Sequence, residues 1–177
     1  MQIAATGFDG LFTVETAPSR DERGYFHRLY DVDAFAAAGI LFTPRQSGIS
    51  HNAKRGTLRG LHFQAAPASQ AKLVRCLSGS IFDVVVDIRA GSATRGKWFG
   101  LELTAETPRA LFVPDGFAHG FITLSDDADV LYELSDGERP GCAAGLRWND
   151  PAIGIDWPFA PLVINPRDDG WPDWKGN

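Results

Sequence analysis

The feature that most constrains the fold is a series of short β-type segments along the chain. They are rich in branched and aromatic residues, and glycine, proline or serine turn signals separate them about every 8 to 12 residues. This spacing is typical of an antiparallel sandwich or barrel, so we expect an all-β fold. The segments run over residues 11–15, 25–30, 46–50, 57–64, 72–77, 81–89, 98–103, 110–114, 121–124 and 130–134.

One segment is typical of a helix and not of a strand. Residues 33–39 are alanine-rich, begin with an acidic residue and end at Gly39, which predicts a single short helix. After Pro140 the sequence becomes irregular and rich in tryptophan and proline, which indicates a packed tail. Since no repeat, low-complexity run or linker is visible, we expect one domain spanning residues 1–177.

Composition narrows the classes of partner. A net charge of −5 argues against nucleic acid as a main partner, because that role needs a basic surface. No apolar run approaches the roughly 18 to 20 residues of a membrane span. The N-terminal sequence does not resemble a signal peptide, and Cys76 and Cys142 lack the spacing of a metal or redox pair. We therefore expect a cytoplasmic protein with reduced thiols and no membrane partner.

Two short motifs bring chemistry into the predicted strands. Arg59-Gly60-Leu61-His62 places a guanidinium and an imidazole three residues apart, and His119 lies in a similar setting between phenylalanines. If both strands line one cavity, they supply a proton acceptor and a phosphate-binding group. Taken alone, a histidine in a strand is more often a hydrogen-bonded core residue, and for His119 both interpretations stay open.

With these motifs, the chain resembles the dTDP-4-dehydrorhamnose 3,5-epimerase family. The resemblance extends nearly end to end and implies a cupin jelly roll, or double-stranded β-helix, with short peripheral helices. It further implies a homodimer that needs no cofactor. The implied substrate is a nucleotide sugar, a nucleoside diphosphate joined to a 4-keto-6-deoxyhexose, which the enzyme epimerises at C3, C5 or both. The blocks that carry the resemblance are residues 21–24, 59–62, 72–75, 82–89, 116–121 and 148–151.

Inversion beside a ketone requires a base, a cation at the ketone oxygen and an acid on the opposite face. The resemblance assigns these roles to His62 as base, Lys72 as the cation and Tyr132 as the acid, with Asp168 orienting the imidazole. Each has a structural alternative. Tyr132 would be a half-buried aromatic residue, Asp168 a solvated loop carboxylate, and Lys72 a charge at a strand edge.

The same comparison predicts the groups that bind the substrate. Arg23 and Arg59 match contacts to the diphosphate, and Arg167 stands where the family tends to carry a lysine. His119 is a candidate for ligand contact. Gln46 begins a segment that matches the family's base-recognition residues. A guanidinium binds phosphate oxygens in a bidentate manner, which suits the positioning of a reacting sugar.

This chain departs from the family at the positions that recognise the base. Arg28 replaces a glutamate that accepts a hydrogen bond from thymine, and Glu138, preceded by Gly137, stands where the family has a tyrosine that stacks on thymine. Gly48 replaces an asparagine two residues after Gln46. We expect a cytidine or other non-thymidine nucleotide sugar. The alternative is an unchanged dTDP substrate whose base is held by the backbone or by a partner subunit.

Other functions of this fold class are less consistent with the sequence. A cupin metal site usually takes a His-x-His pair, and this chain has only His62 in that segment, so we expect no metal. A nucleotide-sugar 3,4-ketoisomerase or a non-catalytic sugar-binding cupin is the alternative function. A binding module would have no need of an acid–base set, and a ketoisomerase would exchange protons at different carbons.

Overall fold

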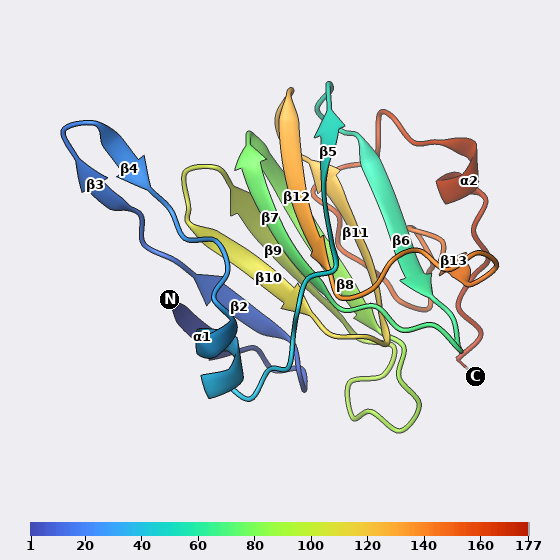
Figure 1. Cartoon of the computed structure of the whole chain (residues 1–177). Coiled ribbons are helices and arrows are strands. Elements are labelled where there is room, and N and C mark those ends of the chain that lie inside the picture. Colours follow the sequence, from blue (N-terminus) through green and yellow to red (C-terminus); the bar gives the residue numbers. More distant parts are fainter. Residues whose placement is uncertain (177) are drawn as a thin grey trace.

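The structure, a computed structural model, describes residues 1–176, in which two antiparallel β-sheets face each other and a separate two-stranded hairpin projects from them (Figure 1). The six-stranded sheet has the order β1-β2-β10-β7-β12-β5, and the five-stranded sheet has the order β13-β6-β11-β8-β9. This arrangement confirms the expected all-β sandwich. The elements are β1 (Gln2–Ala5), β2 (Phe12–Glu15), β3 (Ser19–Asp21), β4 (Gly24–Phe26), α1 (Val32–Ala37), β5 (Gln46–Asn52), β6 (Leu58–Gln64), β7 (Lys72–Ser78), β8 (Ser80–Asp87), β9 (Trp98–Thr104), β10 (Arg109–Val113), β11 (Phe117–Thr123), β12 (Ala128–Leu134), β13 (Ala143–Gly145) and α2 (Pro166–Asp169).

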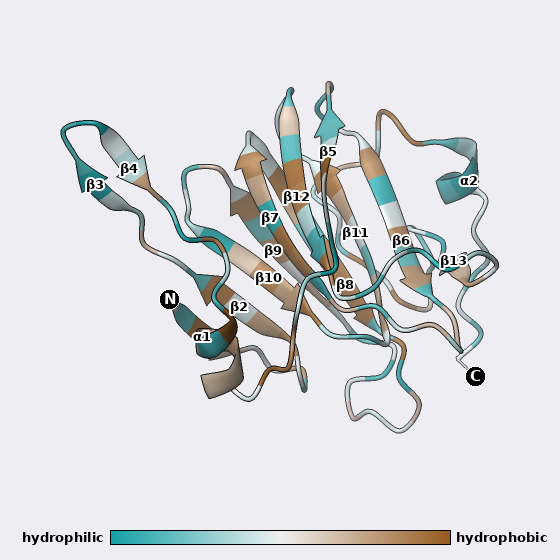
Figure 2. Cartoon of the chain, in the orientation of Figure 1, coloured by the Kyte–Doolittle hydropathy of each residue, from teal (hydrophilic) through white to brown (hydrophobic). Residues whose placement is uncertain are grey.

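The space between the sheets holds an apolar core. Alternate residues of each strand point inward, so Val74 and Val130 of the six-stranded sheet meet Ile81 and Phe121 of the five-stranded sheet. All four are fully buried. Burying such a side chain contributes about 1.5–3 kcal/mol. Figure 2 shows the central strands mainly in the hydrophobic colour, whereas the tip of the β3–β4 hairpin is hydrophilic.

Helix α1 packs a second apolar cluster against one end of the six-stranded sheet. The helix begins after Asp31, whose side chain accepts hydrogen bonds from the backbone N–H groups of Asp33 and Ala34. Its Phe35 is fully buried and contacts Phe42 and the neighbouring strands. The helix predicted over residues 33–39 is therefore present, although it starts one residue earlier and ends at Ala37.

The strand predicted over residues 25–30 is shorter than expected, because β4 ends at Phe26. The residues after it return to the body of the molecule. There the His27 ring hydrogen-bonds to the Thr16 hydroxyl at 2.5 Å, and Tyr30 packs against the Phe35 ring. The turn signal at residues 21–24 indicated that a strand follows, but these tertiary contacts determine the path of residues 27–30.

The C-terminal tail covers the outer face of the five-stranded sheet. Leu146 and Ile153 are buried against Leu61 and Val84 of that sheet, with Trp157 at the edge of the cluster. The tail is less irregular than its composition suggests, because it contributes strand β13 and the short helix α2. Within residues 1–176, neither helix is long and apolar enough to cross a membrane.

Strands β6 and β11 approach each other closely at two glycines. A Cβ atom on Gly60 would lie 2.6 Å from the Gly120 Cα, and one on Gly120 would lie 2.7 Å from the Arg59 carbonyl oxygen. The pairing shifts register between His119 and Phe121 at this point. Glycine is therefore required at both positions, of which Gly120 directly follows His119 and Gly60 lies two residues before His62.

Candidate active site

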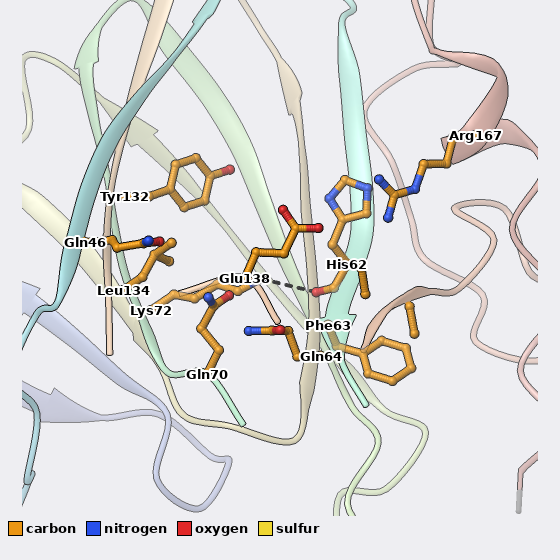
Figure 3. Close-up of a pocket in the computed structure, with 12 residues that line it drawn as sticks. Gln46, His62, Phe63, Gln64, Gln70, Lys72, Tyr132, Leu134, Glu138 and Arg167 are labelled. Atoms are coloured by element: carbon orange, nitrogen blue, oxygen red, sulfur yellow. Dashed lines mark hydrogen bonds between the residues drawn. The ribbon is translucent and has the colours of Figure 1, made fainter. Parts of the chain in front are cut away.

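A cavity of about 330 Å³ opens beside strands β6, β7 and β12. Figure 3 shows side chains from both sheets pointing into it. Along β5 it adjoins a second hollow of about 480 Å³, which shares Gln46, Tyr132 and Leu134 with the first. Of the residues predicted from the sequence, the first cavity is lined by Gln46, His62, Lys72, Tyr132, Glu138 and Arg167.

His62 and Asp168 form a hydrogen-bonded pair at one wall of the cavity. The His62 Nε2 and Asp168 Oδ1 atoms are 2.8 Å apart, and the other Asp168 oxygen accepts a hydrogen bond from the Gly60 backbone N–H at 3.0 Å. The Asp168 side chain is only 1% exposed. A buried carboxylate of this kind holds the proton on Nε2 and leaves the Nδ1 lone pair free to accept one.

Helix α2 sets the position of Asp168. Its cap residue Asn165 accepts a hydrogen bond from the Asp168 backbone N–H at 2.7 Å, and Pro166 occupies the first turn. A carboxylate from the C-terminal tail thereby reaches a strand more than 100 residues earlier in the chain. Asp168 is a buried partner of the imidazole and not a solvated loop residue.

Partial burial favours the neutral form of His62, whose side chain is 40% exposed. Loss of hydration lowers the pKa of the imidazole below its usual value, and the hydrogen bond and charge of Asp168 oppose that effect only in part. The positive charge of Lys72 lowers the pKa further. A neutral imidazole that faces a cavity is suited to abstract a proton.

Lys72 lies at the start of β7 with its ammonium group against β6. Its Nζ donates a hydrogen bond to the His62 carbonyl oxygen at 3.2 Å, the dashed line in Figure 3. Burial lowers the pKa of this lysine to about 8, and the carboxylate of Asp83 opposes the shift. The side chain therefore remains mostly charged at neutral pH and can stabilise a developing oxyanion.

Tyr132 extends into the cavity from β12, across from His62 (Figure 3). Burial raises the pKa of its phenol well above the usual value, with a further contribution from the Asp83 charge. The hydroxyl group thus stays protonated at neutral pH and is available as a proton donor. Its ring meets the His119 ring edge-on, with centroids 5.8 Å apart.

His119 forms a second, fully enclosed histidine–carboxylate pair. Its Nε2 atom lies 2.8 Å from Asp83 Oδ1, and both side chains are buried. His119 is also the register partner of His62 across the β6–β11 ladder. The structure thus shows the structural hydrogen bond for His119, which contacts Tyr132 but is not among the residues that line the cavity.

Two residues that lie against the cavity side chains, Asp83 and Trp171, were not predicted from the sequence. Asp83 carries a charge in the middle of the apolar strand β8, and that contrast was the available signal. Trp171 lies against the His62 ring, with centroids 6.4 Å apart, but no motif distinguishes it from the other tryptophans of the tail.

The predicted arginines are dispersed. The Arg59 guanidinium donates hydrogen bonds to Asn52 Oδ1 at 2.7 Å and to the His51 carbonyl oxygen at 3.2 Å, on the β5 side of β6. It lies near enough to Tyr132 for its charge to oppose the rise in the pKa of the phenol. Arg167 lines the cavity, and its guanidinium lies 5.1 Å from the centre of the Trp171 ring.

Arg23 and Arg28 lie outside the cavity of their own chain. Arg23 occupies the turn of the β3–β4 hairpin, pairs with Asp21 at 2.6 Å and has an 84% exposed side chain. Arg28 pairs with Asp31 at 2.8 Å beside helix α1. Figure 1 shows the hairpin projecting away from both sheets. Among residues 1–176, no cluster of three or more histidine, cysteine or acidic side chains is arranged to hold a metal ion.

Comparison with known proteins identifies the family. Residues 5–176 match the sequence profile described as dTDP-4-dehydrorhamnose 3,5-epimerase. The enzyme of that name from Salmonella typhimurium is 44% identical over 163 residues, which cover 92% of this chain and 88% of the relative.

Solved structures agree with the sequence comparison. A dTDP-4-dehydrorhamnose 3,5-epimerase from Bacillus anthracis with TDP and PPi bound superposes with a TM-score of 0.94 at 35% identity, covering 98% of this chain and 99% of the other. A dTDP-6-deoxy-D-glucose-3,5-epimerase from Legionella pneumophila in complex with dTDP-4-keto-L-rhamnose gives 0.91 at 37% identity, covering 97% and 92%. The cupin jelly roll expected from the sequence is confirmed. The chain belongs to the dTDP-4-dehydrorhamnose 3,5-epimerase family, whose members are isomerases acting on sugars.

Proposed function

We propose that the chain catalyses epimerisation, at C3, C5 or both, of a 4-keto-6-deoxyhexose carried on a nucleoside diphosphate, without a cofactor. The observation that carries the proposal is the grouping of His62, Lys72 and Tyr132 around one cavity, with Asp168 buried behind the imidazole. These residues have the protonation states that the reaction needs at neutral pH: a neutral base, a charged amine and a protonated phenol.

The reaction divides into two proton transfers. The Nδ1 atom of His62 accepts the proton from the carbon beside the ketone, and the electron pair of that C–H bond moves into an enolate. The Lys72 ammonium stabilises the negative charge on the ketone oxygen. The Tyr132 hydroxyl then donates a proton to the carbon from the opposite face, and proton exchange with solvent restores both residues.

The hollow along β5 offers space for the diphosphate of the substrate. It continues from the cavity past Gln46 and Gly48, so the diphosphate of a sugar beside His62 would extend in that direction. Arg167 at the cavity and Arg59 beside β5 provide the positive charge for a diphosphate. The bound nucleotide and nucleotide sugar of the two solved relatives are consistent with such a ligand.

The working unit in this proposal is a homodimer. Tyr25 and Phe26 are 65% and 69% exposed on a hairpin that leaves the body of the molecule, and Ile49 is 61% exposed on the edge strand β5. Apolar side chains in such positions favour burial against a second copy of the chain. The hairpin would then carry Arg23 to the partner's site, and Arg28, at the base of the hairpin, would lie nearer to it.

The proposed base is cytosine or another base that is not thymine. Glu138 lines the cavity, and its carboxylate accepts hydrogen bonds only, so it favours a base that presents an amino group. Arg28, if it comes from the partner, would donate to the N3 acceptor of cytosine, whereas thymine has a donor at that position. Competition between CDP and dTDP for the free enzyme tests this assignment, and a clear preference for dTDP would reject it.

The activity itself is tested by NMR in deuterated water with CDP- and dTDP-4-keto-6-deoxyglucose. We expect deuterium at C3 or C5, together with a product of inverted configuration. Exchange at C3 with migration of the keto group from C4 to C3 would identify a 3,4-ketoisomerase instead. Binding of both sugars without any exchange would indicate a non-catalytic sugar-binding protein.

A further inference from the structure

Trp171 follows helix α2 and lies directly against the imidazole of His62. The two ring centroids are 6.4 Å apart and the planes meet at 72°, which is an edge-to-face contact. Such pairs contribute beyond their buried area and restrict the orientation of both rings. The indole thus covers one side of the proposed base.

The same indole packs onto the strand beside His62. A Cβ atom on Gly145 of β13 would lie 2.4 Å from the Trp171 ring, so the ring rests on the backbone at that glycine. Gly145 is the register partner of His62 in the β13–β6 pairing. Trp171 therefore contacts the imidazole and the strand segment that pairs with it.

Trp171 also fixes the element that carries the carboxylate. Helix α2 has four residues, too few to be stable without tertiary contacts. Besides the Asn165 cap, it is held by the Trp148 Nε1–H, which donates to Asp169 Oδ1 at 3.2 Å, and by Trp171, over whose ring the Arg167 guanidinium lies at 5.1 Å. One indole thus connects Arg167 of the helix to His62 of the strand.

We propose that Trp171 is a positioning residue for proton transfer. It fixes the orientation of the His62 ring relative to helix α2, and it excludes water from one side of the imidazole. The inference rests on the proposed function, in which His62 is the base. It makes Trp171 a determinant of both the orientation and the protonation state of that base.

Burial of the His62 imidazole determines the sign of the expected effect, and the charged groups around the ring modify its size. The groups that face the ring are Asp168 from α2, Lys72 from β7 and His119 from β11, while Glu138 and Arg167 line the same cavity. Burial is the main cause that lowers the pKa of His62. Without the indole, water reaches the covered side and favours the charged imidazolium, so the pKa rises.

The test compares Trp171→Ala and Trp171→Phe with the unmodified protein. For the alanine variant we expect the acidic limb of the kcat/KM profile to move to higher pH and kcat/KM near neutral pH to fall roughly tenfold. Phenylalanine keeps an aromatic edge against the imidazole and should restore most of the rate and the original limb. Trp157→Ala is the matched control, because Trp157 lies in the same tail but its ring contacts Phe82 of β8, whereas the Trp171 ring contacts His62.

A second readout does not depend on turnover. The NMR titration of the His62 ring, identified by loss of its signal in His62→Ala, should shift upward in Trp171→Ala and not in Trp157→Ala. If the chain proves inactive on nucleotide sugars, this titration still tests the positioning role by itself. If the alanine variant does not fold, Trp171→Leu should show a smaller shift in the same direction.

The proposal is overturned if neither the acidic limb nor the His62 titration moves when the indole is removed. It is also overturned if Trp157→Ala moves them equally, because the effect would then reflect general loosening of the tail.

Discussion

Each residue of the cavity has a protonation state that its surroundings determine. Burial holds the pKa of His62 down, whereas the Lys72 ammonium keeps its charge because Asp83 lies nearby. Burial also raises the pKa of Tyr132 and prevents its ionisation. Base, cation and acid thus coexist in one small space because burial favours the neutral form of each, while the ordinary pKa of lysine is high enough for Lys72 to stay mostly charged at neutral pH.

Replacement of the base should separate chemistry from binding. We expect His62→Ala to lower kcat by at least about a hundredfold, the lower end of the contribution of general-base catalysis. The dissociation constant for the nucleoside diphosphate, measured by calorimetry, should change little, because in the proposed reaction His62 acts on the sugar and not on the nucleotide. Asp168→Asn should lower kcat in the same direction. A collapse of nucleotide binding in His62→Ala would assign the residue a structural role.

The pH profile should have two limbs. At low pH, kcat/KM falls because His62 gains a proton, and at high pH it falls as Lys72 loses its proton near its pKa of about 8. Arginine remains charged over this range, so Lys72→Arg should move the alkaline limb upward even if the rate is lower. An alkaline limb that is unchanged in Lys72→Arg would show that another group causes it.

At the residue scale, the sequence predicted the side chains that meet in the cavity better than the groups expected to bind the rest of the substrate. His62, Lys72 and Tyr132 reach one cavity because they lie in regular strands, where position along the chain largely determines direction. Arg23 and Arg28 do not reach that cavity, since Arg23 lies on a hairpin that leaves the body of the molecule and Arg28 pairs with Asp31 beside α1. Asp83 was overlooked because the family resemblance of residues 82–89 assigns it no role, although it stands among apolar residues of β8.

At the scale of elements, the close approach of β6 and β11 holds the two histidines opposite each other. The pairing of His119 with His62 lies beside the contact of Gly60 with Gly120. The sequence predicted both strands from their composition. It did not predict their spacing, because a register shift at glycines leaves no periodic signal.

This contact predicts a clear stability effect. Gly120→Ala places a methyl group 2.7 Å from the Arg59 carbonyl oxygen, so one strand must move. We expect the free energy of unfolding in urea to fall by about 1–3 kcal/mol, together with activity. Gly7→Ala is a suitable control, since a Cβ there has no neighbour within 4 Å. Equal stability of the two variants would contradict the importance of this contact.

Helix α2 is an element that the sequence did not predict. Its four residues have no helical periodicity, and the proline and tryptophan around it indicate an irregular tail. Yet Asp168 depends on that short helix for its position. Only the tertiary contacts of the tail reveal the element.

At the scale of the whole molecule, the β3–β4 hairpin projects from the body of the molecule and packs against neither sheet. Its exposed Tyr25 and Phe26 predict a dimer, which sedimentation should detect. A double substitution, Tyr25→Ser with Phe26→Ser, should weaken both the dimer and nucleotide binding, since Arg23 would lose its place at the partner's site. Leu162→Ser, at a 73% exposed leucine near α2, should change neither. A monomeric protein with full activity would contradict the proposal.

The central claim is that His62 and Tyr132 act on opposite faces of the sugar. Its most direct test is to follow proton exchange and inversion separately by NMR in deuterated water, using Tyr132→Phe and His62→Ala. We predict that Tyr132→Phe still exchanges the proton beside the ketone but inverts the carbon much more slowly, because His62 returns deuterium to the face it came from. His62→Ala should lose both exchange and inversion. Inversion at an unchanged rate in Tyr132→Phe, or continued exchange in His62→Ala, would contradict the account.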